Sequence, residues 1–235
     1  MRKKELSIEQ KNADKDLNII IYPTLISLIV YLIFGKDIMN FAKTSEMNIW
    51  LRFIPILLIQ FGLAGLGSLI DICYRKEKLK EYGLVKKNFF KTILLSLVVC
   101  IPSIIFMLVN NKINSYLPLK GCFFTSLFLN SNYPTNILGY ILIVFVWGIV
   151  EGFNYVVISK KINERYISKN KWLNYGAIVC GLICVLIHGI VGFDLYTIFE
   201  AITTFILIYG MLIVKEKTNN AWGCIFIFLF FWNAI

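Results

Sequence analysis

Long apolar runs alternate with short polar segments along the whole chain. Six runs of about 20 residues and a seventh of about 15 cover positions 17–35, 50–74, 90–110, 137–159, 172–191, 195–214 and 221–235. An α-helix rises 1.5 Å per residue, so about 20 apolar residues cross the ~30 Å hydrocarbon core of a bilayer. We therefore predict an all-α fold, a polytopic transmembrane helix bundle with about seven spans.

One apolar segment is too short to cross a bilayer. It is GCFFTSLFLN at 121–130, and we expect it to be re-entrant or interfacial. The polar residues 1–16 are predicted to form a cytoplasmic tail, and residues 17–235 a single transmembrane domain. The first run is longer than a signal-peptide core and no small-residue cleavage site follows it, so we expect this helix to be retained.

The composition is typical of a membrane protein and changes the interpretation of the excess of basic residues. Hydrophobic residues make up 58% of the 235 residues and charged residues 16%, against roughly 25% charged residues in soluble domains. Lys and Arg exceed Asp and Glu by 24 to 14. In a soluble protein this excess indicates nucleic acid, but here it belongs to the loops that contact lipid headgroups. We predict a lipid bilayer as partner and no nucleic acid.

The distribution of Lys and Arg gives an orientation. Five lie in the N-terminal tail, seven between positions 75 and 91, five between 160 and 171, and two at 215 and 217, and the intervening loops carry the other five. The positive-inside rule then predicts that the N-terminus is cytoplasmic and the C-terminus is outside. Because the chain is rich in Lys, Asn and Ile, as proteins of AT-rich bacterial genomes are, we expect an integral protein of the bacterial cytoplasmic membrane.

Polar side chains inside the predicted spans are candidates for function, because a charged group at mid-bilayer costs at least ~2.5–3.5 kcal/mol. His188 is the one histidine of the chain and lies in GLICVLIHG. Glu151 lies in VFVWGIVEGFNYVV, and Asn154 and Tyr155 follow it by three and four residues, on the same helix face. Asn233 lies among aromatic residues in the last run.

Each of these groups also has a structural interpretation. His188 and Asn233 are side chains that can join helices by a hydrogen bond. Asp71 ends the second run, so we expect it at the interface. The spacing of Cys180, Cys184 and His188 is compatible with a metal site, but small apolar packing explains the cysteines equally well. We therefore predict no metal site, no cofactor and no disulfide framework.

The spacing of Glu151 and His188 favours a catalytic role for the two residues. A carboxylate and an imidazole on consecutive antiparallel helices can polarise a water between them. Their midpoint falls in the polar sequence SKN at 168–170, which suits the tip of a helical hairpin. If the fourth helix continues through 158–167, the two side chains come level across that hairpin.

At these residues the sequence resembles the CPBP family, the group of CAAX-protease and bacteriocin-processing intramembrane glutamic endopeptidases also called the Abi family. The family has a Glu-Glu-x-x-x-Arg motif, a Phe-x-x-x-His motif and a late His-x-x-x-Asn/Asp motif. EGFNYV at 151–156 is similar to the first, CVLIH at 184–188 to the second and LFFWN at 229–233 to the third. The resemblance covers a core at 137–235 and implies that Glu151 and His188 activate a water, with Asn233 on the oxyanion side.

The chain departs from the family pattern at three of its polar positions. Gly152 replaces the second glutamate, Val156 the arginine and Leu229 the late histidine. Loss of one oxyanion donor typically costs ~10²–10³ in rate. Asn154 and Tyr155 share a face with Glu151, and they are candidates to supply the missing donor.

These features predict an intramembrane glutamic-type protease that hydrolyses peptide bonds of membrane-associated proteins or peptides. The resemblance implies a role in bacteriocin processing or self-immunity. The alternative is a non-catalytic membrane immunity or partner protein of the same family, which the substitutions at 152 and 229 favour. A third hypothesis is a transporter with a proton path through Glu151, His188 and Glu200, although we find no internal repeat.

Overall fold

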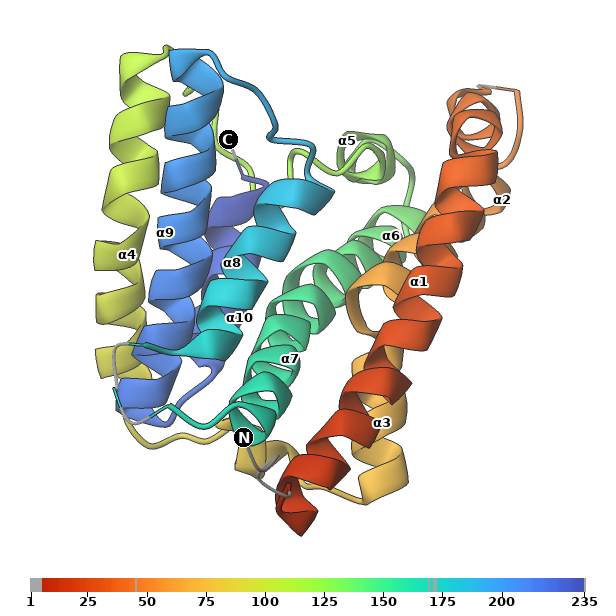
Figure 1. Cartoon of the computed structure of the whole chain (residues 1–235). Coiled ribbons are helices and arrows are strands. Elements are labelled where there is room, and N and C mark those ends of the chain that lie inside the picture. Colours follow the sequence, from red (N-terminus) through yellow and green to blue (C-terminus); the bar gives the residue numbers. More distant parts are fainter. Residues whose placement is uncertain (1–5, 45, 169, 171–172, 235) are drawn as a thin grey trace.

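The computed structural model describes residues 6–44, 46–168, 170 and 173–234. In these residues the chain is a bundle of helices without strands (Figure 1). Five helices are long and apolar enough to cross a membrane, and two shorter helices are also apolar. The predicted all-α membrane bundle is confirmed.

The long helices are in part composites, in which a π-helical segment joins two α-helical ones. Their bounds are α1 Ile8–Lys43, α2 Ile49–Phe61 continued by η1 Gly62–Leu66 and α3 Gly67–Arg75, α4 Phe89–Val109, α6 Thr135–Ile143 continued by η3 Val144–Val150 and α7 Glu151–Arg165, and α9 Leu195–Thr218. The shorter elements are the 3₁₀ turn η2 Leu79–Tyr82, α5 Phe124–Leu129, α8 Tyr175–Ile187, and α10 Trp222–Ile227 continued by η4 Phe228–Trp232.

The first helix begins nine residues before its apolar run. Ser7 accepts a hydrogen bond from the Gln10 backbone N–H, and the Gln10 side chain accepts one from the Ser7 N–H. This capping box starts α1 at Ile8. Residues 8–16, which we predicted as part of a polar tail, therefore belong to the helix. The ten-residue apolar segment contains α5, which has six residues and is too short to span.

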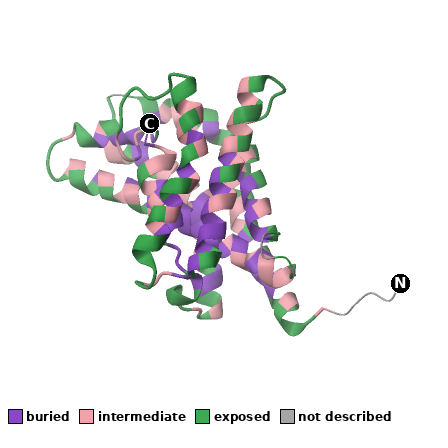
Figure 2. Ribbon diagram, turned by 90° about the vertical axis from the view of Figure 1, so that its left-hand side faces the viewer, coloured by how far each residue is buried: buried purple, intermediate pink, exposed green. Residues whose placement is uncertain are grey.

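The helices form two groups that meet at α7 and α10. On one side, α1 packs against α2, η1, α3 and α7; on the other, α4 and α8 pack against α9, and α10 packs against α4 and α7. Buried residues concentrate at the centre of the bundle, and exposed residues cover its outer faces (Figure 2). Exposed apolar side chains are what a surface in contact with lipid requires, because lipid tails solvate them.

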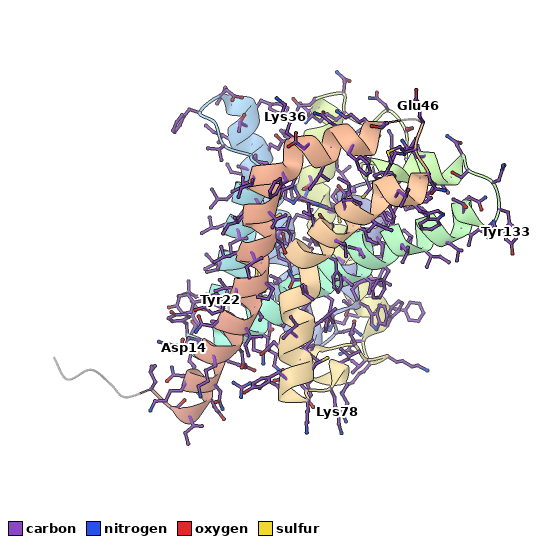
Figure 3. The ribbon with its side chains drawn as sticks, turned by 90° about the vertical axis from the view of Figure 1, so that its right-hand side faces the viewer. Asp14, Tyr22, Lys36, Glu46, Lys78 and Tyr133 are labelled. Carbon is purple, nitrogen blue, oxygen red and sulfur yellow. The ribbon has the colours of Figure 1, made fainter. Side chains whose placement is uncertain are left out.

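The two ends of the bundle carry different segments. The start of α1, the 76–88 segment and the α7–α8 turn lie at one end, which we call the Lys161 end. The α1–α2, α4–α6 and α8–α9 connections lie at the other, which we call the Lys112 end (Figure 1). Figure 3 shows Asp14 and Lys78 near the first end, and Lys36 and Glu46 near the second.

A buried cluster of charges joins four segments at the Lys161 end. The Lys161 ammonium donates to Asp16 Oδ2 at 2.9 Å and to Glu77 Oε2 at 2.8 Å, and it lies 3.1 Å from Asp71 Oδ2. The Lys161 side chain is 1% exposed and Asp71 is fully buried. Arg75 forms a second ion pair with Asp16. Asp71, which we expected at the interface, is buried within the protein at this end of the bundle, with Lys161 from α7 as its ion-pair partner.

Glu77 and its hydrogen-bond partner Tyr82 lie outside the spans, and the pKa values of both are shifted. Burial of Glu77 opposes its ionisation, but hydrogen bonds from Lys161 and Tyr82 outweigh burial and lower the pKa of Glu77. Burial and the hydrogen bond to the Glu77 carboxylate raise the pKa of Tyr82. The cluster thus favours an ionised Glu77 and a neutral Tyr82.

Candidate functional site

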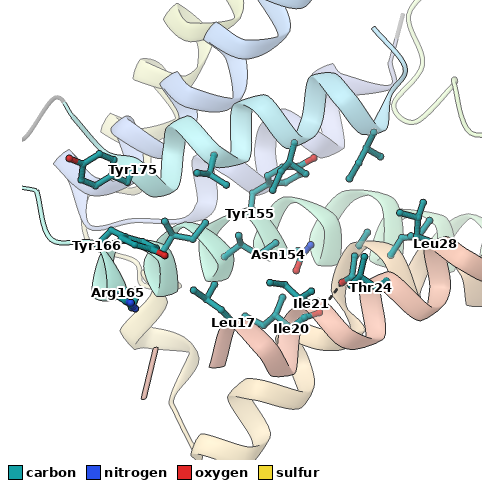
Figure 4. Close-up of a pocket in the computed structure, with 18 of the residues that line it drawn as sticks. Leu17, Ile20, Ile21, Thr24, Leu28, Asn154, Tyr155, Arg165, Tyr166 and Tyr175 are labelled. Atoms are coloured by element: carbon teal, nitrogen blue, oxygen red, sulfur yellow. Dashed lines mark hydrogen bonds between the residues drawn. The ribbon is translucent and has the colours of Figure 1, made fainter. Parts of the chain in front are cut away.

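A cavity of about 1250 Å³ lies between α1, α7 and α8. Glu151 and Asn154 from α7 and His188 from the end of α8 line it together. Figure 4 shows the wall that α1 contributes, from Leu17 to Leu28, facing Asn154 and Tyr155. We call this space the main cavity. It brings three of the four predicted site residues to one place.

The main cavity opens sideways between α1 and α8. Both helices pack on α7, which forms the floor between them (Figure 1). Side chains of both rims face the cavity and are still exposed, among them Ile21 and Leu25 at 45% each and Ile187 at 55%. In a membrane an opening of this kind faces lipid, so an apolar chain or helix can reach Glu151 without crossing water.

Gln60 is the hydrogen-bond partner of Glu151. Its Nε2 donates to Glu151 Oε2 at 2.9 Å, and Glu151 is 6% exposed. Gly65 brings the two composite helices together, because a Cβ at this position would lie 2.0 Å from Val150 Cγ1. This contact is not predictable from the sequence, since Gln60 and Glu151 are 91 residues apart. Gln60 fixes the carboxylate while leaving its other oxygen without a described partner.

The register of the α7–α8 hairpin determines how Glu151 and His188 are placed. The α7 helix continues to Arg165 and not through 167, and Glu151 and His188 do not come level across the hairpin as we predicted. A Cβ at Gly176 would lie 2.2 Å from the Ser159 carbonyl oxygen, and Cys180 Sγ donates to the Tyr155 oxygen at 3.7 Å. Continued by four residues, this register sets Glu151 opposite Cys184. His188 lies one further helical turn, about 6 Å, toward the Lys112 end.

His188 is exposed to the cavities around it. It caps the end of α8, where its ring lies edge-on to Trp232 with centroids 5.1 Å apart. Trp232 contacts Phe228, which stacks on Tyr155 with centroids 5.3 Å apart. These ring contacts run from His188 at the end of α8 to Tyr155 on α7, and both of these residues line the main cavity. The imidazole forms no hydrogen bond with any side chain that the structure describes, so both ring nitrogens are available to a ligand or water.

Asn154 is oriented by one hydrogen bond. Ser68 Oγ donates to Asn154 Oδ1 at 2.5 Å, and both side chains are buried. Because the amide oxygen is occupied by Ser68, the Nδ2 amide group is the part of Asn154 that can donate to a ligand. This is the chemistry that an oxyanion donor needs.

Asn233 does not line the main cavity. It lines a second space of about 330 Å³, the small cavity, together with His188, Lys112 and Glu200. The Asn233 backbone oxygen accepts from the Gly121 N–H at 2.8 Å, so the segment before α5 packs against the end of the last helix. His188 lines both cavities and separates Glu151 from Asn233.

Three π-helical segments adjoin the polar groups. Gln60 lies just before η1, Glu151 just after η3, and Asn233 just after η4. The segment η3 packs against both η1 and η4, so the three meet inside the bundle. A π-helical turn inserts a residue and re-aims the side chains beside it, and such turns recur at functional sites.

The three departures from the CPBP pattern have packing explanations. A Cβ at Gly152 would lie 3.0 Å from the Cys224 carbonyl oxygen, so α10 occupies the space of a larger side chain. Val156 is fully buried in the core. Leu229 covers Gly148, where a Cβ would lie 2.1 Å from Leu229 Cδ2. None of these three positions lines the main cavity.

The residues of the two other candidate sites, the metal site and the proton path, do not come together in the structure. Among the described residues no group of three or more His, Cys, Asp or Glu side chains could hold a metal ion. Cys180 and Cys184 are buried in the core with Cys224. Glu200, the third member of the hypothetical proton path, pairs with Lys112 at 3.2 Å and lies on the far side of His188 from Glu151.

The chain matches no protein-family model, no curated protein sequence and no solved structure. The likeness to the CPBP family therefore depends on the residues at 151–156, 184–188 and 229–233 alone.

Proposed function

We propose that this protein is an intramembrane endopeptidase that uses Glu151 and His188 to activate a water. The observation that carries the proposal is that Glu151, Asn154 and His188 line one cavity that opens toward lipid between α1 and α8. A substrate segment enters through that opening and lies along α7. The substrates are membrane-associated proteins or peptides, because the rims of the opening are apolar.

The groups have separate roles in the proposed reaction. Water attacks the peptide carbonyl carbon while Glu151 takes its proton, and His188 polarises the same water. The Asn154 amide donates to the oxyanion that develops on the carbonyl oxygen. The peptide C–N bond then breaks, and the proton on Glu151 passes to the leaving amine. Gln60 orients Glu151, and Asn233 is outside this set.

The proposal includes an orientation in the bacterial cytoplasmic membrane. The Lys161 end, where α1 begins and where the basic segment 75–88 lies, is the cytoplasmic end. The Lys112 end faces the outside. In this orientation the main cavity extends from the cytoplasmic interface near Tyr166 to His188 in the outer half.

A comparison of new protein N-termini tests the proposal. Bacterial cells carry the wild type, Glu151→Gln or the control Glu164→Gln at equal membrane levels. Glu164 is on the same helix, but its side chain is 38% exposed and pairs with Lys160 outside the cavity. A set of termini present with wild type and Glu164→Gln should fall by about 10²–10⁴-fold in Glu151→Gln. Identical sets of termini in all three contradict catalysis.

A second candidate is a non-catalytic partner or immunity protein that holds an apolar segment in the main cavity. The observation in its favour is that apolar packing fills positions 152, 156 and 229, where the family carries polar groups. Here Glu151→Gln would keep the biological effect of the wild type, and Leu25→Trp, which narrows the opening, would remove it. The same two variants both lose the effect if the protein is a peptidase.

A further inference from the structure

His188 forms a wall shared by two cavities of different character. The main cavity is lined on both rims by apolar side chains of α1 and α8. The small cavity has a polar lining for its size, including Ser103, Thr203 and Thr204 besides Lys112 and Glu200. A polar space of about 330 Å³ holds on the order of ten waters, at ~30 Å³ each.

The small cavity leads inward from the Lys112 end. The Lys112 and Glu200 side chains at its mouth are 45% and 32% exposed, whereas Thr204 is 7% and Leu207 1% exposed further in. Lys112 follows the end of α4, and Glu200 lies in the second turn of α9, at the same end of the bundle (Figure 1). The exposed fractions thus decrease from that end into the bundle along α9.

A partly exposed ion pair lies at the mouth of the small cavity. Lys112 Nζ lies 3.2 Å from Glu200 Oε1 and 4.6 Å from the centroid of the Tyr196 ring. These contacts hold the Lys112 side chain across the α4–α9 surface and hydrate the entrance, because an ion pair this exposed keeps its water. Thr203 lines the same space as the pair.

We propose that the small cavity delivers water to His188 from the Lys112 end of the bundle. A peptide segment that fills the main cavity displaces solvent there, yet each cleavage consumes one water. A second route that reaches the opposite side of the His188 ring supplies that water while substrate is bound. The inference deepens the proposed function and rests on it, but its test needs no cleavage.

The test measures the reactivity of a cysteine at position 188 from each side of the membrane. His188→Cys is combined with Cys73→Ser, because Cys73 is exposed whereas the other five cysteines are buried. Right-side-out and inside-out vesicles receive a small membrane-impermeant cation, trimethylammonium-ethyl methanethiosulfonate. We expect modification from the Lys112 side. Modification only from the Lys161 side, or from neither side, overturns the inference.

A pair of blocking variants identifies the route. Thr203→Phe fills the small cavity and should abolish modification from the Lys112 side, whereas Thr24→Phe, which narrows the main cavity from α1, should leave it unchanged. Unchanged modification in Thr203→Phe contradicts the route. If Thr203→Phe does not insert into the membrane, the side from which His188→Cys is modified still tests the inference. If the protein is not a peptidase, the protein N-termini in cells with Glu151→Gln will be the same as with wild type. The labelling results at position 188 do not depend on that outcome.

Discussion

The cluster around Lys161 and the site around Glu151 are both polar and both centred on a buried residue of α7, but the partners of these two residues differ. Lys161 contacts three carboxylates within 3.1 Å. Ten residues away, about 15 Å along the same helix, Glu151 has one neutral partner, Gln60. Charges that balance one another hold helices together, while a carboxylate with a single neutral partner keeps the capacity to take up a proton.

The comparison assigns stability to one region and chemistry to the other. A buried charge without a counter-ion costs several kcal/mol. The four segments joined at Lys161 therefore cannot separate from one another without leaving a buried charge unpaired. The site has the opposite property: Glu151 and Asn154 have neutral hydrogen-bond partners and face a cavity. Variants at the two regions should therefore separate loss of folding from loss of cleavage.

The largest effect on stability is expected from Lys161→Met. The substitution leaves Asp71 buried without its cation, and breaking a buried pair in this way costs ~3–5 kcal/mol. Unfolding of the purified protein in detergent measures the change. Lys160→Met is the matched control, because the Lys160 side chain is 21% exposed and should contribute at most about 1 kcal/mol.

A double variant sharpens this prediction. If the loss in Lys161→Met arises from the uncompensated charge of Asp71, then adding Asp71→Asn should recover part of it. Equal stability of Lys161→Met and wild type would show that the cluster does not hold the bundle.

Restoring the family's second glutamate should destabilise the protein without raising activity. Gly152→Glu inserts a side chain where α10 backbone atoms lie 3.0 Å from a Cβ, and overpacking typically costs ~1–3 kcal/mol. Gly152→Ala should show a smaller loss in the same unfolding measurement. A Gly152→Glu protein that is as stable as wild type and cleaves faster would show that position 152 faces the site.

A smaller effect on stability is expected from acid. Since the pKa of Glu77 is lowered on folding, its ionised form stabilises the protein above the ordinary value of 4.5, and this contribution is lost as the pH falls through the folded pKa. Unfolding midpoints measured from pH 6 downward should therefore drop less steeply below about pH 4.5 in Glu77→Gln than in wild type. Parallel curves would mean that Glu77 is not coupled to folding.

An effect on cleavage is expected from Gln60→Leu. A hydrogen bond to a charged group is worth ~1.5–3 kcal/mol, so cleavage should fall by about ten- to a hundredfold as Glu151 loses its orientation. Gln10→Leu is the control, since Gln10 lines the distant end of the main cavity and bonds to the Arg165 carbonyl. Equal cleavage by both variants would exclude an orienting role for Gln60.

Much of the fold follows from hydropathy, because each apolar run must cross the bilayer or be buried. The spans at 50–74 and 90–110 were predicted to within one residue of Ile49–Arg75 and Phe89–Val109. The start of α1 at Ile8 was missed, although the capping-box sequence SIEQ at 7–10 could have revealed it. The run at 172–191 overestimated α8, since an apolar sequence does not show where a helix ends.

The site was predictable only where its residues share a helix or a hairpin. The proximity of Glu151 and Asn154 follows from helical spacing, and their placement with His188 follows from a short turn. The contacts of Gln60 with Glu151, of Ser68 with Asn154 and of Asp16 with Lys161 join positions at least 86 residues apart. Periodicity indicates which face of a helix is buried, but it does not indicate which helix covers that face.

The most direct measurement is cleavage by purified protein in liposomes of membrane proteins extracted from the host. Wild type, Glu151→Gln and Glu164→Gln are compared after their unfolding midpoints have been shown to agree. We predict new N-termini with wild type and Glu164→Gln and none above background with Glu151→Gln. New termini produced equally by a correctly folded Glu151→Gln protein would contradict the assignment of the chemistry to this carboxylate.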